Sequence, residues 1–256
     1  MPSATADDLL YAADPVLWSE EVLGYHPDPW QADLLRSRSR KIILNCSRQS
    51  GKSTTCAALG LHESIYRRPS FGLVVAPSQD QSGELMMKFD EFRSAVELPS
   101  DYLSSDTKLA VKFANGNRFI ARPGSEKSAR SFSAVTLLLE DEASRVLDDL
   151  YNSVRPMLAV SNGRHILMST PFGKRGHFFH IWNEQRDSWE WYEIPAEKCP
   201  RITKEFLEEE QRTNPWFEQE YHCVFMETTD SVFTFEQVAA AVSEDVEPLL
   251  IEVPEW

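Results

Sequence analysis

Residues 41–55, KIILNCSRQSGKSTT, constrain the fold more than any other part of the sequence. An apolar run suited to a β-strand leads into a polar loop, which ends in Gly51, Lys52 and Ser53 before an Ala-rich helical pattern. In such an arrangement, backbone N–H groups and the helix start supply positive potential to a polyphosphate, the lysine reaches the β- and γ-phosphates, and the hydroxyl can hold Mg²⁺. Cys46 stands where the usual pattern has its first glycine. The stretch therefore predicts a P-loop with one departure.

The composition indicates a globular protein without a membrane span. The chain has 256 residues, enough for one α/β domain with a small appendage. No apolar run approaches the ~18 residues that cross a membrane, and the N-terminus lacks the basic segment of a secretion signal. The four cysteines form no CxxC pair, so we expect reduced, buried thiols rather than a zinc site or disulfides.

The negative charge is concentrated at one end of the chain. The net charge is −14, but residues 201–256 hold 3 basic and 14 acidic residues, which leaves only −3 for residues 1–200. A nearly neutral body can carry local basic faces that bind phosphates. The overall charge therefore does not exclude nucleic acid as a partner.

A second informative stretch is LLLEDE, residues 137–142. An apolar strand that ends in adjacent carboxylates places Asp141 to hold Mg²⁺ through water and Glu142 to orient and deprotonate an attacking water. An acidic patch after a strand is ordinary by itself. The order of a P-loop followed by this pattern predicts a nucleotide-hydrolysing site.

The remaining apolar runs predict a mostly parallel sheet between helices. FGLVVA, residues 71–76, is typical of a strand buried on both faces, and WEWYEIP resembles a further strand. Asn115-Gly116 lies between two alternating runs, which indicates a hairpin. RHILMSTP, residues 164–171, predicts a strand that enters a loop, FGKRGHFF. Hydroxyls of Ser169 and Thr170 at its C-terminal end either sense the γ-phosphate or simply end the strand.

Several polar side chains outside these motifs have two interpretations each. Gln31 lies before the P-loop and can either read the adenine edge with its amide or sit on a helix surface. The basic run 36–41, RSRSRK, is by default a solvated face, with a phosphate-backbone contact as the alternative. Arg122 and Arg130 can reach a phosphate, including one in a neighbouring subunit, or can be ordinary surface arginines.

The C-terminal part predicts a lid and a linker. ITKEFLEEEQRT and NPWFEQEYHCVF have the pattern of two short helices, which we expect to form a lid on the nucleotide side. The chain from Asp230 becomes acidic and linker-like. We therefore divide the chain into an ATPase core (1–195), a lid subdomain (196–230) and an acidic linker (231–256).

Taken together, the motifs resemble the ATPase half of a large terminase subunit, the DNA-packaging motor of tailed bacteriophages. The resemblance covers about residues 25–235 and rests on WQ before the first strand, SRQSGKST, VVAPSQDQ, LLLEDEAS, STPFGKRG, and WFEQEYHCVF followed by DSVF. An Arg-bearing P-loop without its first glycine is typical of that family. STP-x-G matches the family's coupling motif, which assigns coupling to Ser169 and Thr170.

The resemblance implies the additional-strand, catalytic-Glu (RecA-like) branch of P-loop NTPases, with ATP and Mg²⁺ as ligands. It implies a motor that drives double-stranded DNA into a viral procapsid as a ring on the capsid portal, with a small terminase subunit as partner, in the host cytoplasm. Family members usually continue into an RNase H-like nuclease, and we expect no nuclease activity from these 256 residues. In some members an arginine acts on the neighbouring subunit, for which Arg130 is the first choice and Arg122 the second.

The resemblance and the motifs together give each site residue a role. Glu142, Arg48 and Arg130 are the catalytic set, with Arg48 either stabilising developing charge or helping to set the lid. Ser53 and Asp141 hold the metal. The expected nucleotide-binding residues are Gln31, Ser47, Arg48, Gln49, Ser50, Gly51, Lys52, Ser53 and Thr54.

Two other functions remain as alternatives at this point. A superfamily 2 helicase-like DNA-dependent ATPase also pairs an upstream Gln with a strand-ending acidic motif, but it needs a second RecA-like domain, for which residues after 200 have too little strand–helix alternation. A nucleotide-dependent assembly scaffold without turnover has no need of a water-activating carboxylate, so Glu142 argues against it.

Overall fold

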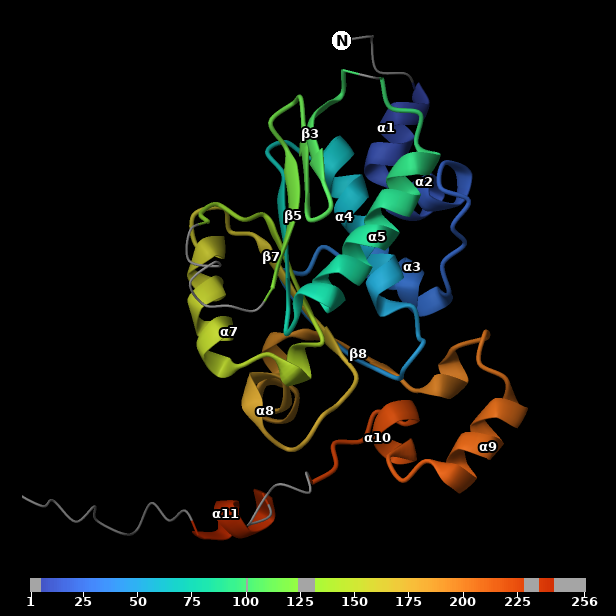
Figure 1. Ribbon diagram of the computed structural model, residues 1–256, viewed down its shortest axis with the longest axis vertical. Coiled ribbons are helices and arrows are strands. Elements are labelled where there is room, and N and C mark those ends of the chain that lie inside the picture. The colour runs from blue at the N-terminus through green and yellow to red at the C-terminus, as the bar shows by residue number, and fades with distance from the viewer. Residues whose placement is uncertain (1–5, 100, 124–131, 228–234, 242–256) are drawn as a thin grey trace, which may run out of the picture.

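The computed structural model describes residues 6–99, 101–123, 132–227 and 235–241. In this part of the chain, one eight-stranded sheet forms the centre of the molecule, with helices on both faces (Figure 1). The strand order is β3-β4-β5-β2-β6-β7-β1-β8. The bounds are β1 Lys41–Cys46, β2 Phe71–Ala76, β3 Leu103–Thr107, β4 Ala110–Phe113, β5 Arg118–Pro123, β6 Leu137–Asp141, β7 Arg164–Ser169 and β8 Glu190–Ile194.

The strands from β5 to β8 in this order pair in parallel, as the continuous apolar runs predicted. Every residue of β2, β6 and β7 is buried, which is the expected environment of a parallel strand covered on both faces. Strand β7 lies between β1 and β6, so one additional strand separates the P-loop strand from the strand with the paired carboxylates. The fold is therefore α/β, mostly parallel and of the RecA-like P-loop NTPase type, as predicted.

Antiparallel strands extend one edge of the sheet. Strands β4 and β5 form the predicted hairpin, whose turn contains Gly116 with φ of 89°. The side-chain oxygen of Asn115 accepts a hydrogen bond from the backbone N–H of Asn117 at 2.8 Å. Strand β3 was not predicted. Its sequence, LSSDT, is polar and largely exposed because it is an edge strand, and its register to β4 shifts between Leu103 and Ser105.

Helices α1 to α5 cover one face of the sheet, and α7 and α8 cover the other (Figure 1). Their bounds are α1 Ala6–Ala13, α2 Pro15–Glu21, α3 Pro29–Arg36, α4 Lys52–Tyr66, α5 Gln79–Ala95, α7 Asp148–Val154 and α8 Gly176–Glu184. Short 3₁₀ helices are η1 Ala143–Arg145, η2 Arg155–Leu158, η3 Arg186–Ser188 and η4 Ala196–Lys198. A Cβ on Gly60 would lie 2.4 Å from the ring of Phe119, so glycine allows α4 to pack closely against the sheet.

After β8 the chain forms a small helical unit, α9 Lys204–Thr213 and α10 Phe217–Tyr221, beside one end of the sheet (Figure 1). It has its own apolar cluster of Ala196, Phe217 and Tyr221. These are the two helices that the sequence predicted as a lid. A further helix, α11 Phe235–Ala241, falls within the segment interpreted as a linker.

Two other sequence predictions have clear outcomes. FGKRGHFF was predicted as a loop, which is wrong for its second half, because helix α8 begins at Gly176. The four cysteines are free and buried, as expected. Within the described ranges, no helix combines the length and apolar character needed to span a membrane.

Candidate active site

A cleft of about 1030 Å³ lies at the C-terminal ends of the parallel strands, between the P-loop and the segment that contains helices α9 and α10. Parallel strands bring these ends to one edge, and the pairing of Asn45 with Ser169 and of Asp141 with Met168 fixes their level. Residues from Arg48 to Thr54 line the cleft together with Glu142 and Thr170. The structure therefore brings the P-loop, the acidic strand end and the end of β7, where coupling was predicted, to one place.

The P-loop conformation depends on left-handed backbone at two positions. Gly51, the residue before helix α4, has φ of 92°, and Gln49 has φ of 58°. The backbone angle of Gly51 favours glycine, and a Cβ there would lie 2.7 Å from Nε2 of Gln31 and would displace that amide. The backbone N–H of Ser47 donates to the carbonyl of Ile194 at 2.8 Å, which ties the start of the loop to the end of β8.

Four predicted site residues meet directly. Nζ of Lys52 lies 2.8 Å from Oε1 of Glu142, and Oγ of Ser53 donates to Oδ2 of Asp141 at 3.1 Å. Oδ1 of Asp141 accepts the backbone N–H of Glu142 at 3.0 Å. A hydroxyl and a carboxylate in contact are the oxygen ligands that Mg²⁺ prefers, so this pair fits the predicted metal position.

Burial and charge oppose each other in this group. Burial raises the pKa of the Asp141 carboxyl above its usual value, although the Lys52 ammonium pulls it down. Burial alone would lower the pKa of Lys52, but the carboxylates of Glu142 and Asp141 outweigh burial and raise that pKa. The lysine is therefore held in its charged form beside the two carboxylates.

The turn that carries Glu142 is joined to Ser169 and Thr170 through Ser144. Glu142 has φ of 52°, and the chain then enters η1. Oγ of Ser144 lies 2.7 Å from Oγ of Ser169 and donates to the carbonyl of Thr170 at 2.8 Å. Ser169 also accepts the backbone N–H of Ser144 at 3.2 Å. The turn that carries Glu142 and the end of β7 thus share one hydrogen-bond network.

Gln31 lies behind the P-loop and is buried. Its Oε1 accepts hydrogen bonds from the Tyr25 hydroxyl at 2.9 Å and the Asp28 backbone N–H at 2.8 Å, while Nε2 donates to the carbonyl of Ser50 at 3.2 Å. The amide therefore supports the phosphate loop and the start of α3 here. Its adenine-reading role stays a prediction.

Two arginines connect the P-loop to other segments that line the cleft. Nη1 of Arg48 lies 3.2 Å from Oε1 of Glu220 in α10, and the backbone N–H of Arg48 donates to the Glu220 carbonyl at 2.8 Å. Arg201, between η4 and α9, donates to both carboxylate oxygens of Asp28 at 3.1 and 2.7 Å and to the carbonyl of Ser50 at 3.2 Å. The guanidinium of Arg48 thus points to helix α10.

Sequence reasoning missed Arg201 and its partner Asp28. No local pattern could have found this contact, because 173 positions separate the two residues. It also missed Arg145, which lines the cleft with its guanidinium 3.7 Å from the ring centre of Phe172, itself part of the STPFGKRG motif. The position of Arg145, three residues after Glu142 in the LLLEDEAS stretch, was the available signal.

Of the two candidates for a trans-acting arginine, the structure describes only Arg122. Arg130 lies outside the described residues. Arg122, at the C-terminal end of β5, is half-buried, with its guanidinium 5.5 Å from the ring centre of Phe132 and Nη1 3.4 Å from the Ala121 carbonyl. Either assignment stays a prediction.

Comparison with known proteins places this site in a family. The family described as terminase large subunit, T4-like-virus type, N-terminal, matches residues 43–240. The terminase large subunit of Thermus virus P23-45 is 25% identical over 173 residues, covering 60% of this chain and 35% of that relative. The chain thus spans about a third of the relative's length.

Solved structures support the fold. The ATPase domain of the large terminase of Thermus phage P74-26 matches with a TM-score of 0.68 at 20% identity, covering 81% of this chain and 97% of that one. The large terminase of a thermophilic bacteriophage in complex with ADP matches with a TM-score of 0.58 at 13% identity, covering 78% and 54%. Because the family match runs from strand β1 to helix α11, over more than half of the chain, the chain belongs to the terminase large subunit family, as its N-terminal domain of the T4-like-virus type.

Proposed function

We propose that this chain is the ATP-hydrolysing motor domain that drives double-stranded DNA into a viral procapsid. The observation that carries the proposal is that Lys52, Ser53 and Glu142 line one cleft of a terminase-family chain, with Asp141 hydrogen-bonded to Ser53 beside it. A protein that only binds a nucleotide would need Lys52, Ser53 and Asp141 for the phosphates and the metal. Glu142 adds the group that hydrolysis needs, a carboxylate beside the γ-phosphate position.

The phosphates of ATP would lie over the P-loop, residues Ser47 to Thr54, with Lys52 moving from Glu142 to the β- and γ-phosphates. Glu142 is then free to orient the attacking water and accept its proton. Gln31 would read the adenine edge, for which its amide has to turn away from Tyr25 and Ser50. Ser169 and Thr170 would pass the loss of the γ-phosphate on from the turn at Ser144.

Ser53 and Asp141 are the residues that would hold Mg²⁺. When bound, the ion neutralises charge that develops on the transferred phosphoryl group. The hydrogen bond between Ser53 and Asp141 keeps both oxygen ligands turned to the same point. We propose that activity depends on Mg²⁺ for this reason.

We propose the three-part division for the chain, with residues 1–195 as ATPase core, 196–230 as lid and 231–256 as the link to a nuclease domain. Arg48 would hold the lid through Glu220 or turn toward the developing charge. A fragment limited to these parts would not cleave DNA. The proposed setting is the host cytoplasm, as a ring on the capsid portal with the small terminase subunit.

Ring assembly would complete the site with an arginine from the neighbouring subunit, Arg130 first and Arg122 second. Such an arginine contributes ~10³–10⁵ in rate, so an isolated subunit should hydrolyse ATP poorly.

The test is ATP hydrolysis per subunit as a function of protein concentration. It compares the unmodified chain, Glu142→Ala, Arg130→Ala, and an equal mixture of the two variants. We expect specific activity to rise with concentration and the mixture to regain rate that each variant lacks. Concentration-independent activity would remove the shared site. No Glu142-dependent turnover at any concentration would leave a nucleotide-dependent scaffold.

A further inference from the structure

A second cleft, of about 880 Å³, lies at the opposite end of the sheet from the nucleotide site. It is bordered by the α1–α2 junction, the end of α3, the second half of α4 and the turn before β7. Strands β1 and β7 begin here, at Lys41 and Arg164, whereas the P-loop and Ser169 follow their other ends. The proposed function makes no use of this cleft.

The cleft concentrates positive charge in a chain of net charge −14. Its lining includes two carboxylates, Asp14 and Glu63, and five arginines, Arg36, Arg38, Arg40, Arg67 and Arg164. The local balance of these lining groups is therefore about three positive charges. A patch of this sign on an acidic protein favours an anionic ligand.

The carboxylates do not neutralise all five guanidinium groups. Asp14 holds Arg36 with two hydrogen bonds of 3.0 and 2.7 Å. Glu63 is shared between Arg164 at 3.0 Å and Arg67 at 3.3 Å. The guanidinium groups of the remaining two arginines, at positions 38 and 40, have no hydrogen bond or ion pair to any described residue.

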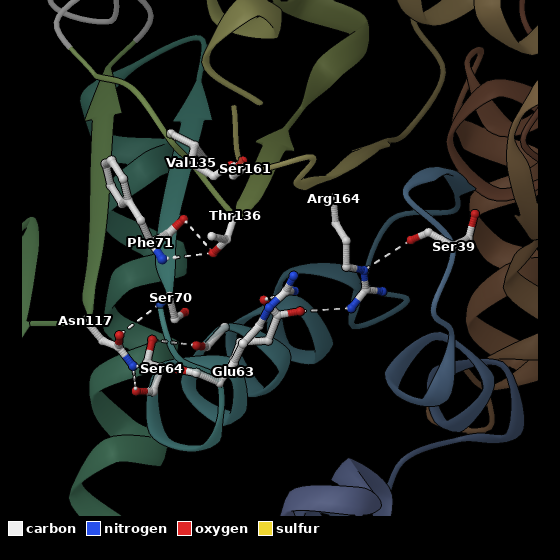
Figure 2. A network of polar contacts seen from close by, with 12 residues as sticks. Ser39, Glu63, Ser64, Ser70, Phe71, Asn117, Val135, Thr136, Ser161 and Arg164 are labelled. Atoms are coloured by element: carbon white, nitrogen blue, oxygen red, sulfur yellow. Dashed lines mark hydrogen bonds and ion pairs between the residues drawn. The ribbon is translucent and has the colours of Figure 1, made fainter. Parts of the chain in front are cut away.

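Arg164 fixes the loop that carries these two arginines (Figure 2). Its side chain is nine-tenths buried, its Nη1 bonds to Glu63, and its Nε donates to the carbonyl of Ser39 at 3.2 Å. Its Nη2 is buried and has no hydrogen-bond partner among the described residues. Ser39 is half-buried, while its neighbours Arg38 and Arg40 are exposed. The hydrogen bond from Arg164 thus fixes the loop at Ser39, and the loop exposes the side chains of Arg38 and Arg40 to solvent.

The position of the cations indicates the kind of anion. Arg36 and Arg67 have side chains 54% and 43% exposed, and Arg38 and Arg40 are exposed as well. Four of the five guanidinium groups therefore stand on the rim, and only Arg164 lies in the floor. A small polyanion is best held by groups that enclose it, whereas a polymer that passes over the surface is met by a row of exposed cations.

We infer that this cleft contacts the phosphodiester backbone of double-stranded DNA, independently of base sequence, with Arg38 and Arg40 as the main phosphate ligands. The inference rests on the proposed function for the presence of DNA. Arginine side chains at exposed positions supply phosphate contacts that position a duplex without reading it. Because the nucleotide enters at the other end of the strands, DNA and ATP would not compete for space.

The test is binding of a short, labelled, mixed-sequence duplex to the full chain, followed by fluorescence anisotropy between about 50 and 200 mM salt. The variant is Arg38→Glu with Arg40→Glu. The control is Lys108→Glu with Lys112→Glu, which makes the same change in net charge at two exposed lysines of the β3–β4 hairpin. ATP hydrolysis without DNA is measured for all three proteins.

We expect the arginine variant to bind DNA at least ~10-fold more weakly, and its log Kd to depend less steeply on log salt, by about 1.8 for two lost phosphate contacts. The lysine control should keep both values, and all three proteins should hydrolyse ATP equally. An equal loss of DNA affinity in the arginine and lysine variants would show that only the net charge matters, and it would overturn the inference. A wild-type chain that hydrolyses ATP but binds no duplex at low salt would also overturn it while leaving the ATPase in place.

A last arm separates DNA from a small polyanion. Inorganic tripolyphosphate is titrated into Lys52→Ala, which weakens the nucleotide site, with and without the two arginine substitutions. We expect binding weaker than that of the duplex. Tighter binding that disappears with Arg38→Glu and Arg40→Glu would assign the cleft to a small phosphate ligand and end the DNA assignment.

Discussion

Nζ of Lys52 lies 2.8 Å from Oε1 of Glu142, so the lysine expected to bind the γ-phosphate is paired with the carboxylate expected to activate water. Both side chains are mostly buried, at 12% and 23% exposure. The carboxylate oxygen that contacts the ammonium is occupied and cannot at the same time accept a proton from an attacking water. Arrival of a phosphate that draws Lys52 away would therefore both fix the substrate and release the base.

The first prediction follows from this ion pair. Glu142→Gln should lower kcat for ATP hydrolysis by about 10²–10⁴, the usual contribution of a general base. ATP itself should bind more tightly, because the neutral amide competes less for Lys52. Phosphate release and binding of a labelled nucleotide measure the two effects separately. Glu91→Gln, at an exposed position on α5, is the control. Weaker ATP binding together with unchanged turnover would contradict the pairing.

A second prediction concerns the hydrogen bond between Arg201 and the P-loop. Arg201→Ala and Asp28→Asn should each raise KM for ATP, because each removes the bidentate contact that holds Arg201 on the Ser50 carbonyl. The double variant should raise KM for ATP little more than either single variant does. This non-additivity corresponds to a coupling energy of at least ~0.5 kcal/mol. Steady-state kinetics of the four proteins give this cycle. Strictly additive effects would mean that the two side chains act independently.

The third prediction concerns stability of the Glu63–Arg164 pair, whose side chains are only 8% and 10% exposed. Glu63→Gln should lower the free energy of unfolding by about 3–5 kcal/mol, because the guanidinium is left buried without its counter-charge. Glu184→Gln removes an exposed partner of His180 in the same way and should cost below ~1 kcal/mol. Urea unfolding measures both. Similar losses of unfolding free energy in the two variants would show that burial of the Glu63–Arg164 pair does not determine its contribution to stability.

A fourth prediction concerns His177, which contacts the buried Glu140 of β6 and the exposed Asp148 of α7. Nε2 of His177 lies 2.6 Å from Glu140 and Nδ1 lies 3.1 Å from Asp148. Burial alone would lower the pKa of His177, but the two carboxylates outweigh it and raise this pKa above its usual value of about 6.5. A raised pKa in the folded state stabilises the protein fully below the unfolded value, and this stabilisation is lost as the pH rises through the folded value.

The urea midpoint of the unmodified chain should therefore contain a decrease, as the pH rises above neutrality, that is missing from His177→Gln. Burial raises the pKa of Glu140, while the hydrogen bonds from His165 and His177 outweigh burial and lower it, so its own contribution is lost only in acid. The two contributions thus act in different pH ranges. Identical pH profiles for the two proteins above neutrality would remove His177 as the cause.

Local patterns predicted those parts of the molecule that local chemistry determines. The P-loop, the strands β2, β6 and β7 and the hairpin at Gly116 follow from apolar runs and turn residues, which act over a few positions. The contacts of Arg201 with Asp28 and of Arg164 with Ser39 depend instead on how distant segments pack, and the sequence carries no local signal for them.

Helix α8 shows how a tertiary contact can hide a local element. Phe178, Ile181 and Trp182 have the spacing of a helix face, and all three are buried. The start of the helix nevertheless has no capping side chain of its own, because Asp148 from α7 accepts the backbone N–H of His177 at 2.7 Å. A cap supplied by another helix leaves the segment with the composition of a loop.

Helix α4 connects the two clefts, because its residues line both of them. Its first turn carries Lys52 and Ser53, and its second half carries Glu63. The boundary residue Arg67 lies about 22 Å from Lys52 at 1.5 Å per residue. Ten of its fifteen residues are buried, so the helix cannot bend or fray without disturbing the core. A shift of this helix along its axis at the phosphate end would therefore move the arginine end by the same distance, because the helix is continuous from Lys52 to Tyr66.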